Sequence, residues 1–375
     1  MAKRIHTKLC DILNIEHPII LAGMATPFGD FEGNASGPEL VAAVSNAGGL
    51  GLIGAGLHAE DLRDQIRRTK QLTQKPFGVD LLIPQNLPPT LTEAARVLNV
   101  DPVKVEEVSR FVKAIGEEMG LPDVREGRIT FAEEEVRSQL RVVFEEKVPV
   151  LAIGLGTPAW VISEAHSHGM KQISLVGNVR NARQVAEDGA DVIVAQGYEA
   201  GGHTGKVGTL VLVPQVVDAV SPTPVVAAGG IGDGRGLAAA LVLGAQGVLC
   251  GTVFLATYEA MIPEFIKQRI IKYNEEDTRI SRIYTGKTAR VMKNKLVEIW
   301  ERSGTPTLPM PIQSMINNKL LRGLKKSNNL EYLTSFAGQV IGMIKELKKA
   351  DDIVFGMVNE AVGLIKEKLP EMVVS

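Results

Sequence analysis

The stretch AQGYEAGGHTG, from Ala195 to Gly205, combines residue types that can hold and transform a small ligand. It follows the apolar run DVIVAQG and sets His203, one of 6 histidines in the chain, among glycines. Glycines let a backbone approach a ligand closely, and histidine changes its charge near neutral pH. The stretch therefore predicts a ligand-binding loop in which His203 does proton or charge chemistry.

Two further glycine clusters suit a phosphate group. AAGGIGDGRG contains Gly229 and Gly230, and CGTVF contains Gly251 and Thr252. Backbone N–H groups in such loops, at the start of a helix, can hold a phosphate dianion. The clusters lack a P-loop lysine, so we expect a firmly held cofactor phosphate in preference to a transferred one. Tight turns without a ligand remain the alternative.

Short apolar runs bounded by glycine or proline alternate with segments of helical periodicity, which is typical of parallel strands joined by helices. The fold that we predict is a (β/α)8 TIM barrel, with a doubly wound open sheet as the alternative. The expected strands are PIILAGMA from Pro18, GLGLIG from Gly49, FGVDLLIP from Phe77, VPVLAIGLG from Val148, QISLVGN from Gln172, DVIVAQG from Asp191, PVVAAGGI from Pro224 and GVLCGTVF from Gly247.

In such a barrel the active site lies at the C-terminal ends of the strands, and a phosphate commonly rests on the loops after the seventh and eighth strands. Gly229 and Gly230 follow the seventh strand, Gly251 and Thr252 follow the eighth, and His203 follows the sixth. All three segments should therefore face one mouth of the barrel.

Two other motifs are better explained by structure than by chemistry. GLGLIG, from Gly49 to Gly54, matches the G-x-G-x-x-G spacing of a dinucleotide site, but a helix precedes it and its glycines lie in the expected strand. We interpret it as a closely packed barrel strand. His166 and His168 could grip a metal, but they end a helix at the opposite side of the barrel. No metal site is expected.

Two segments exceed a minimal barrel. We expect an FMN-binding barrel over residues 1–260, with a charged helical insertion at about 85–147 after the third strand, and a C-terminal helical extension over 261–375 that caps the active site. Within the extension, FAGQVIGMIKELKKA and DDIVFGMVNEAVGLIKEK are predicted to be amphipathic helices.

Composition narrows the class of protein. Of 375 residues, 45% are hydrophobic and 22% charged, with a net charge of −2, so neither nucleic acid nor a membrane surface is expected as a partner. No secretory signal or membrane span is evident, which makes a cytoplasmic location the default. Cys10 and Cys250 form no disulfide framework or zinc spacing, and Cys250 is expected to be buried. A homo-oligomer is left open.

Taken together, PIILAGMA, AQGYEAGGHTG, AAGGIGDGRGLAAALVLGAQGVLCGT and YTGKTAR resemble the nitronate monooxygenases, formerly called 2-nitropropane dioxygenases. The resemblance runs from Pro18 to AGQVIG. It implies an FMN-dependent (β/α)8 barrel related to FMN-containing enoyl-ACP reductases and some quinone reductases. By this resemblance His203 matches the catalytic histidine. The positions that match cofactor-binding residues are Ala22, Gly23, Met24, Asp80, Gln196, Gly201, Gly202, Gly229, Gly230, Gly251 and Thr252.

The sequence departs from that family at three of its motif positions. Leu21 and Gly23 stand where many members have Gln and Pro, and a glycine there is familiar from the reductase branch. Asp80 stands where an asparagine often contacts the flavin. A carboxylate there would disfavour an anionic reduced flavin unless it were protonated or paired.

The resemblance implies an FMN oxidoreductase that converts an alkyl nitronate and O2 to a carbonyl compound and nitrite. His203 would stabilise the bound anion if protonated, or take the α-proton of a neutral nitroalkane if neutral. One alternative keeps FMN but uses NAD(P)H to reduce an enoyl thioester or a quinone. Another is a flavin-binding barrel without turnover.

Overall fold

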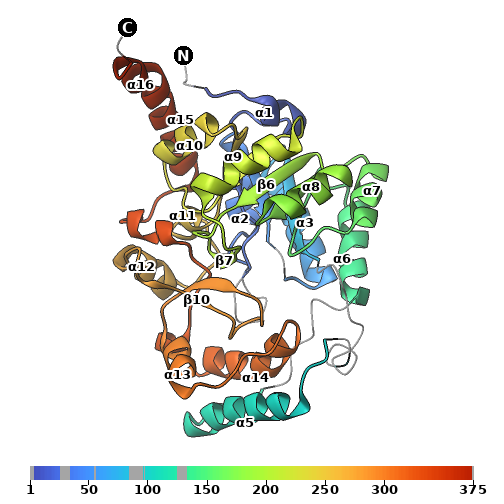
Figure 1. Cartoon of the computed structure of the whole chain (residues 1–375), viewed down its shortest axis with the longest axis vertical. Coiled ribbons are helices and arrows are strands. Elements are labelled where there is room, and N and C mark those ends of the chain that lie inside the picture. The colour runs from blue at the N-terminus through green and yellow to red at the C-terminus, as the bar shows by residue number, and fades with distance from the viewer. Residues whose placement is uncertain are drawn as a thin grey trace.

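The computed structural model describes residues 4–25, 34–54, 56–83, 96, 98–124 and 133–373. Eight parallel strands close into a barrel in the order β1-β2-β3-β4-β5-β6-β8-β9, which confirms the predicted (β/α)8 fold (Figure 1). The strands are β1 (Ile19–Leu21), β2 (Leu50–Ile53), β3 (Phe77–Leu82), β4 (Val150–Gly154), β5 (Lys171–Val176), β6 (Val192–Gln196), β8 (Val225–Ala228) and β9 (Gly247–Cys250).

Closure of the barrel excludes the doubly wound sheet. The first strand pairs with β2 on one side and with β9 on the other, where Ile20 is in register with Leu249. The strands are apolar on both faces because one face packs inside the barrel and the other packs under helices, so they appear in the sequence as continuous apolar runs.

Eight of the helices in the described part of the chain surround the barrel, and each lies between consecutive barrel strands or after the last. They are α2 (Pro38–Asn46), α3 (Ala59–Leu72), α6 (Glu133–Glu145), α7 (Ala159–Ser167), α8 (Val179–Glu187), α9 (Thr209–Val220), α10 (Gly234–Val242) and α15 (Ala350–Gly363). The last of them packs against both α10 and α2 and so closes the ring. The segment DDIVFGMVNEAVGLIKEK thus supplies the helix that follows the eighth barrel strand.

The glycines of GLGLIG serve close packing, as the sequence predicted. A Cβ atom at Gly51 would lie 2.3 Å from the carbonyl oxygen of Val41 on α2, and one at Gly49 would lie 2.8 Å from that of Ile19. Any side chain larger than hydrogen would push α2 away from β2. The motif therefore needs no nucleotide to explain it.

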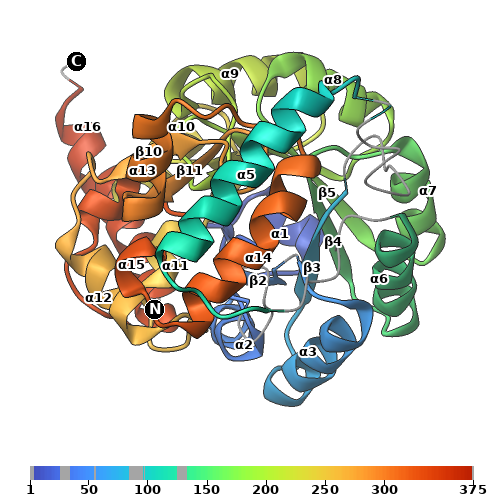
Figure 2. The same ribbon diagram turned by 90° about the horizontal axis from the view of Figure 1, so that it is seen from below.

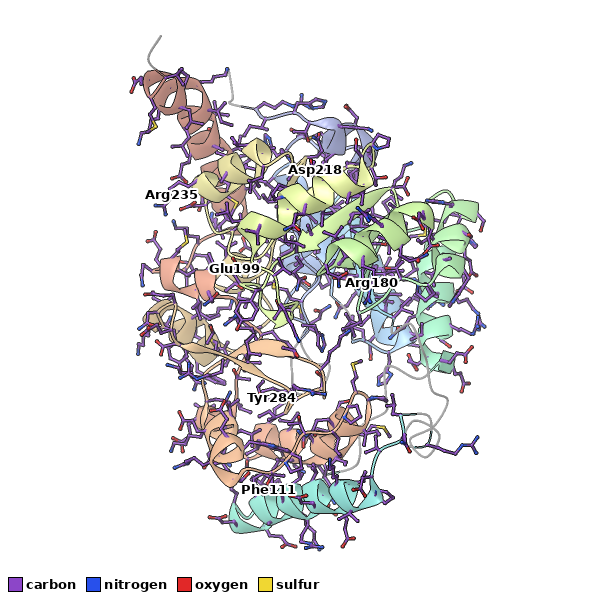
Figure 3. The ribbon with its side chains drawn as sticks, in the orientation of Figure 1. Phe111, Arg180, Glu199, Asp218, Arg235 and Tyr284 are labelled. Carbon is purple, nitrogen blue, oxygen red and sulfur yellow. The ribbon has the colours of Figure 1, made fainter. Side chains whose placement is uncertain are left out.

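A second group of elements lies across the C-terminal end of the barrel, and we call it the cap: α5 (Pro102–Glu118), β10 (Thr278–Ser281), β11 (Ala289–Met292), α13 (Lys295–Ser303) and α14 (Ile312–Lys326). Figure 2 shows α5 and α14 side by side over the barrel. The cap has an apolar cluster of its own, in which Phe111, labelled in Figure 3, packs edge-to-face on Trp300.

The long connection between β3 and β4 is divided between the two parts. Of its described helices, α5 packs on α14 of the cap, whereas α6 packs on α3 in the barrel ring. Residues 84–95, 97 and 125–132 of this connection lie outside the described residues. The division of the chain into residues 1–260, the insertion at about 85–147 and the extension 261–375 stays a prediction.

The prediction of an amphipathic helix over FAGQVIGMIKELKKA is wrong. Residues Gln339–Met343 form only a short 3-10 helix, η2, and the rest of the segment is irregular. The backbone here bonds to other parts of the chain: Gln339 N–H donates to the Glu199 carbonyl at 3.0 Å, and Lys348 N–H donates to that of Ala256 at 3.2 Å. Packing against the His203 loop overrides the helical periodicity.

The remaining elements are short or peripheral. They are α1 (Lys8–Leu13), β7 (Gly202–His203), α11 (Thr252–Leu255), α12 (Glu264–Lys272), η1 (Leu330–Tyr332), η3 (Leu364–Lys368) and α16 (Leu369–Glu371). In the described ranges we find no helix that is both long and apolar enough to cross a membrane. Cys10 and Cys250 are both buried free thiols, as expected for Cys250.

Candidate active site

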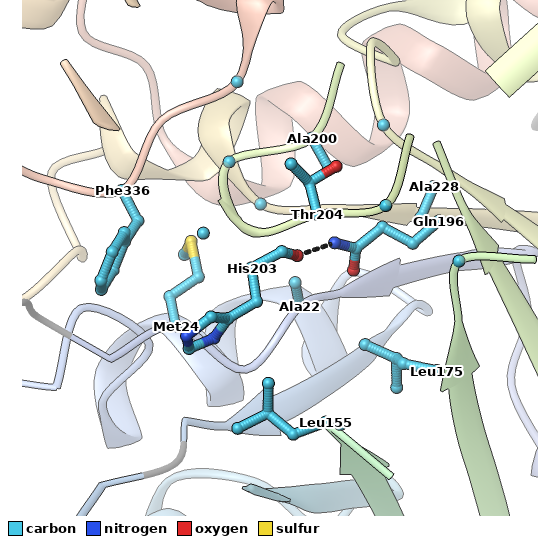
Figure 4. A pocket seen from close by; sticks show the side chains of 18 of the residues that line it. Ala22, Met24, Leu155, Leu175, Gln196, Ala200, His203, Thr204, Ala228 and Phe336 are labelled. Atoms are coloured by element: carbon cyan, nitrogen blue, oxygen red, sulfur yellow. Dashed lines mark hydrogen bonds between the residues drawn. The ribbon is translucent and has the colours of Figure 1, made fainter. Parts of the chain in front are cut away.

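A cavity of about 770 Å³ lies between the C-terminal ends of the barrel strands and the cap. Every residue for which the sequence predicted a catalytic or cofactor-binding role lines this cavity. These residues are Ala22, Gly23, Met24, Asp80, Gln196, Gly201, Gly202, His203, Gly229, Gly230, Gly251 and Thr252. Figure 4 shows Ala22, Met24, Gln196 and His203 among them. The structure thus brings them together; the role of each stays a prediction.

The position of His203 is fixed by strand pairing and by a side-chain hydrogen bond. Gly202 and His203 form β7, which pairs antiparallel with β11 of the cap, so that His203 is in register with Ala289. The Gln196 amide, at the end of β6, donates to the His203 carbonyl oxygen (Figure 4). The loop after the sixth barrel strand is therefore held from both the barrel and the cap.

The electrostatic environment keeps His203 neutral. Burial, with a smaller contribution from the Lys287 ammonium, lowers the pKa of His203 to about 4. Its Nε2 atom lies 2.9 Å from Oγ1 of Thr285. The Thr285 hydroxyl is 3.3 Å from the Lys287 carbonyl oxygen, to which it donates. With that proton so engaged, the His203 ring donates from Nε2, which leaves Nδ1 as its proton acceptor.

Lys287 is a cavity residue to which the sequence analysis gave no separate role. It lies in the cap loop between β10 and β11, and its Nζ atom donates to the Leu155 carbonyl oxygen at 3.4 Å. Leu155, after β4, has a φ of 71°, an uncommon conformation for a leucine. The contact joins the cap to the barrel across the mouth of the cavity. Lys287 belongs to YTGKTAR, one of the motifs that carry the family resemblance, and this motif could have indicated a role for the residue.

The backbone conformation requires glycine after β8 but not after β9. Gly229 and Gly230 have φ angles of 98° and 72°, which other residues rarely adopt. Gly251 has a φ of −110°, and a Cβ atom there would meet its nearest neighbour, Met24 Sδ, at 3.4 Å. The protein therefore has room for a side chain at Gly251, so neither the backbone conformation nor packing explains the glycine there.

Thr252 presents a hydroxyl proton in the same place. Its Oγ1 atom accepts a hydrogen bond from the Gly338 N–H at 2.9 Å. The acceptor side of the hydroxyl is thus used, and its proton remains available to an anionic oxygen. Gly251 and Thr252 together suit a group that approaches the backbone closely and accepts hydrogen bonds.

Glu199 is a second residue without a predicted role. It lies within AQGYEAGGHTG, and its carboxylate accepts hydrogen bonds from the Thr209 backbone N–H at 3.0 Å and from the Thr209 hydroxyl at 2.8 Å. The carboxylate therefore caps the N-terminus of α9. Because it is so engaged, Glu199 orders the loop that carries His203.

The two glycines before His203 make room for protein as well as ligand. A Cβ atom at Gly201 would lie 2.8 Å from the backbone of Ala337 and Gly338. Gly202 has a φ of 70°. Gly201 is thus needed where the segment after the cap crosses the loop, and this packing accounts for it without a cofactor.

Asp80 and Gly23 fit each other closely. The Asp80 side chain on β3 is buried, and a Cβ atom at Gly23 would lie 2.3 Å from Asp80 Cβ. The Gly23 amide donates to the Asp80 carboxyl, while Asp80 Oδ1 is buried without a hydrogen-bond partner. Burial raises the pKa of Asp80 to about 7. The two positions at which Gly23 and Asp80 differ from the family pattern are thus in direct contact.

The cap supplies the wall opposite the barrel strands. Ser314 and Met315 of α14 and Phe336 line the cavity, as does Tyr284. The Tyr284 hydroxyl donates to Asn294 Oδ1 at 3.2 Å, and burial raises its pKa. Since that hydroxyl is engaged and protonated, Tyr284 shapes the wall and does not supply a proton.

His166 and His168 lie away from this cavity. The Nε2 atom of His166 is 2.8 Å from Asp191 Oδ2, and the His168 ring stacks on Phe144 with ring centroids 4.1 Å apart. Both histidines thus have structural partners.

The sequence is similar to those of known proteins over most of its length. The family model for nitronate monooxygenase matches residues 6–360. A Mycobacterium tuberculosis protein named as a monooxygenase is 39% identical, with 87% of this chain and 92% of that protein covered. The "Probable nitronate monooxygenase" of Staphylococcus haemolyticus is 35% identical, with 89% of this chain and 91% of the relative covered.

Solved structures give the same relationship. The nitroalkane oxidase of Streptomyces ansochromogenes matches with a TM-score of 0.80 and 31% identity over 96% of this chain and 99% of its own. FabK of Thermotoga maritima matches with a TM-score of 0.75 and 33% identity over 98% of this chain and 100% of its own. The chain belongs to the nitronate monooxygenase family and is an enzyme of that type.

Proposed function

We propose that the protein is an FMN-dependent monooxygenase that converts alkyl nitronates and O2 to a carbonyl compound and nitrite. The observation that carries the proposal is a cavity at glycine-rich strand ends that is lined by both a cation, Lys287, and a neutral histidine, His203. Family membership supports the reaction type.

The residues present fit FMN. Gly251 has room for a side chain that the sequence does not supply, and the Thr252 hydroxyl retains a donor, as a phosphate would require. The unpartnered Oδ1 atom of Asp80, deeper in the cavity, suits a polar ring system. In this proposal Gly229, Gly230, Gly251 and Thr252 hold the phosphate, and Ala22, Met24, Asp80 and Gln196 hold the ring. When bound, the flavin supplies the electron transfer.

His203 acts as a base on neutral nitroalkanes. An imidazole whose pKa is about 4 is unprotonated at neutral pH, so its Nδ1 atom can accept the α-proton. Thr285 holds the ring through Nε2 at 2.9 Å, which fixes the tautomer. A nitronate has already lost this proton and needs no base. Neutral His203 is therefore assigned to proton removal in preference to anion binding.

Lys287 supplies the positive charge that a neutral His203 does not. Its ammonium is the charged group that contributes to the pKa shift of His203, and it lies at the mouth of the cavity. A cation there attracts the anionic nitronate and disfavours protonation of the histidine. The two roles that the sequence analysis gave to His203 are thus divided between two residues.

The cap excludes water from the cavity. Ser314, Met315 and Phe336 cover the barrel mouth, and the Lys287–Leu155 contact joins cap to barrel. An enclosed site strengthens electrostatic interactions with the bound anion.

A second candidate keeps FMN and uses NAD(P)H to reduce an enoyl thioester or a quinone. Gly23 favours it, because the family resemblance associates a glycine at this position with the reductase branch, and the FabK structure is as similar in sequence as the nitroalkane oxidase, at 33% against 31% identity.

A product assay tests the proposal. Purified protein reconstituted with FMN is mixed with ethyl nitronate in air, and nitrite, acetaldehyde and O2 are measured. Formation of equal amounts of nitrite and acetaldehyde with consumption of O2 supports the monooxygenase. Oxidation of NADPH in the presence of an enoyl thioester or a quinone, with no nitrite from the nitronate, would favour the second candidate.

A further inference from the structure

Asp80 is the buried carboxyl in the wall of the cavity. The side chain is only 4% exposed, yet Oδ1 has no hydrogen-bond partner. A buried polar atom without a partner costs free energy, so a native structure retains one where something compensates for it. Because Asp80 lines the cavity, a bound ligand is the group that can do so.

The neighbouring elements offer Asp80 no compensating charge. The segment after β1 places Gly23 beside it, and β2 and β4, on either side of β3, carry no charged residue. The other titratable groups of the described cavity wall are Glu199, His203, Lys206, Cys250, Tyr284 and Lys287, and none of them contributes to the shift in the pKa of Asp80. The one favourable contact for a carboxylate is the Gly23 amide.

This environment favours the neutral acid. The Gly23 amide donates to the carboxyl, and Oδ1 is left without a partner. In a protonated carboxyl one oxygen carries the proton, and Oδ1, which accepts no hydrogen bond, then has a proton to donate to an acceptor in the ligand. An ionised Asp80 would present a bare negative charge to the ligand at the same place.

We propose that Asp80 is a neutral carboxylic acid that donates its proton to an acceptor on the flavin, so that the flavin binds more weakly where Asp80 is ionised. The inference rests on the proposed function for the presence of the flavin. Gly23 is needed for this position of Asp80, because a Cβ atom at Gly23 would lie 2.3 Å from Asp80 Cβ and displace the side chain.

The matched variant is Asp80→Asn, which has nearly the same shape and is neutral at every pH. Its amide oxygen can accept from Gly23, and its NH2 group can donate to the ligand. Apoprotein of each form is titrated with FMN from about pH 5 to about pH 9 by quenching of flavin fluorescence. The FMN phosphate also titrates in this range, but it does so equally with both proteins, so the ratio of the two dissociation constants isolates Asp80.

The expected ratio, wild type over Asp80→Asn, is constant at low pH. Above the pKa of Asp80 it rises by up to about tenfold for each pH unit, because the wild type must then take up a proton to bind. A ratio that does not change with pH, with FMN bound to both, would overturn the inference and leave the proposed function standing. Failure of both proteins to bind FMN at any pH would overturn both.

A flavin-free measurement tests the protonation by itself. The folded-state pKa of Asp80, about 7, is above its unfolded value of 3.8, so the folded chain binds the extra proton. Its contribution to stability is fully present below the unfolded pKa and is lost as pH rises through about 7. Urea unfolding should therefore show the stability of the wild-type apoprotein falling relative to Asp80→Asn over this window. The same pH dependence of stability in both proteins would overturn the inference that Asp80 is a neutral acid.

Discussion

The Nε2 atom of His203 lies 2.9 Å from the hydroxyl oxygen of Thr285, which is 82 residues further along the chain. One residue belongs to the loop after a barrel strand and the other to the cap. The contact thus makes the tautomer of the candidate base depend on the position of the cap. The backbone pairing of β7, only two residues long, with β11 joins the same loop to the cap.

Replacement of Thr285 tests this dependence. Thr285→Val removes the acceptor for the Nε2 proton, so we expect turnover of a neutral nitroalkane to fall about tenfold, while a preformed nitronate loses less. Thr285→Ser keeps the hydroxyl and should retain activity. Steady-state rates with both substrate forms give the comparison. Equal rates for Val and Ser variants would mean that the contact does not orient the base.

Replacement of His203 should separate binding from turnover. His203→Asn should leave the flavin bound and lower turnover by about a hundredfold or more, with the larger loss for a neutral nitroalkane. His168→Asn is the control, since its ring stacks on Phe144 far from the cavity. Flavin content and rates with both substrates are measured. Wild-type rates for both substrates in the variant would show that His203 is structural.

The pH profile reports the protonation state of His203. A base must be neutral, and the pKa of His203 is about 4, so kcat/KM for a neutral nitroalkane should be constant from neutral pH downwards and fall only as pH approaches 4. Lys287→Gln removes a cation that lowers this pKa, and should move the falling limb to higher pH. If kcat/KM of the wild type fell with a pKa of about 6.5, the ordinary histidine value, the lowered pKa assigned to His203 would be wrong.

Gly251 distinguishes a ligand site from a turn. A side chain there has room and an ordinary φ of −110°, so Gly251→Ala should leave the apoprotein about as stable as the wild type while it weakens FMN binding. Gly230→Ala is the contrasting variant, because its φ of 72° predicts loss of stability as well. Thermal unfolding and FMN titration give the two quantities. If Gly251→Ala bound FMN with unchanged affinity, this loop would not be the binding site of the FMN phosphate.

The barrel could be predicted from the sequence because its signals are local. Each strand is a short apolar run that ends at glycine or proline, and the closed order of strands follows the chain. The residues at strand ends were found for the same reason: in a (β/α)8 barrel, all C-terminal strand ends meet at one face.

The parts that could not be predicted depend on contacts between distant segments. The cap forms because α5 packs on α14, and no local pattern indicates that pairing. The FAGQVIG segment has helical periodicity, but its backbone bonds instead to the His203 loop through Glu199. Lys287 and Thr285 gain their roles only because β11 pairs with β7. Their distance in sequence hides their position in the site.

Anaerobic mixing of the FMN-reconstituted protein with ethyl nitronate, and separately with NADPH, tests the proposed nitronate oxidation most directly. The absorbance of the flavin is followed in both experiments. We expect prompt bleaching by the nitronate, an anion that the Lys287 cation of the cavity attracts, and none by NADPH, which takes no part in the proposed reaction. Prompt bleaching by NADPH and none by the nitronate would contradict this proposal and identify a reductase, and bleaching by neither would point to a flavin-binding protein without turnover.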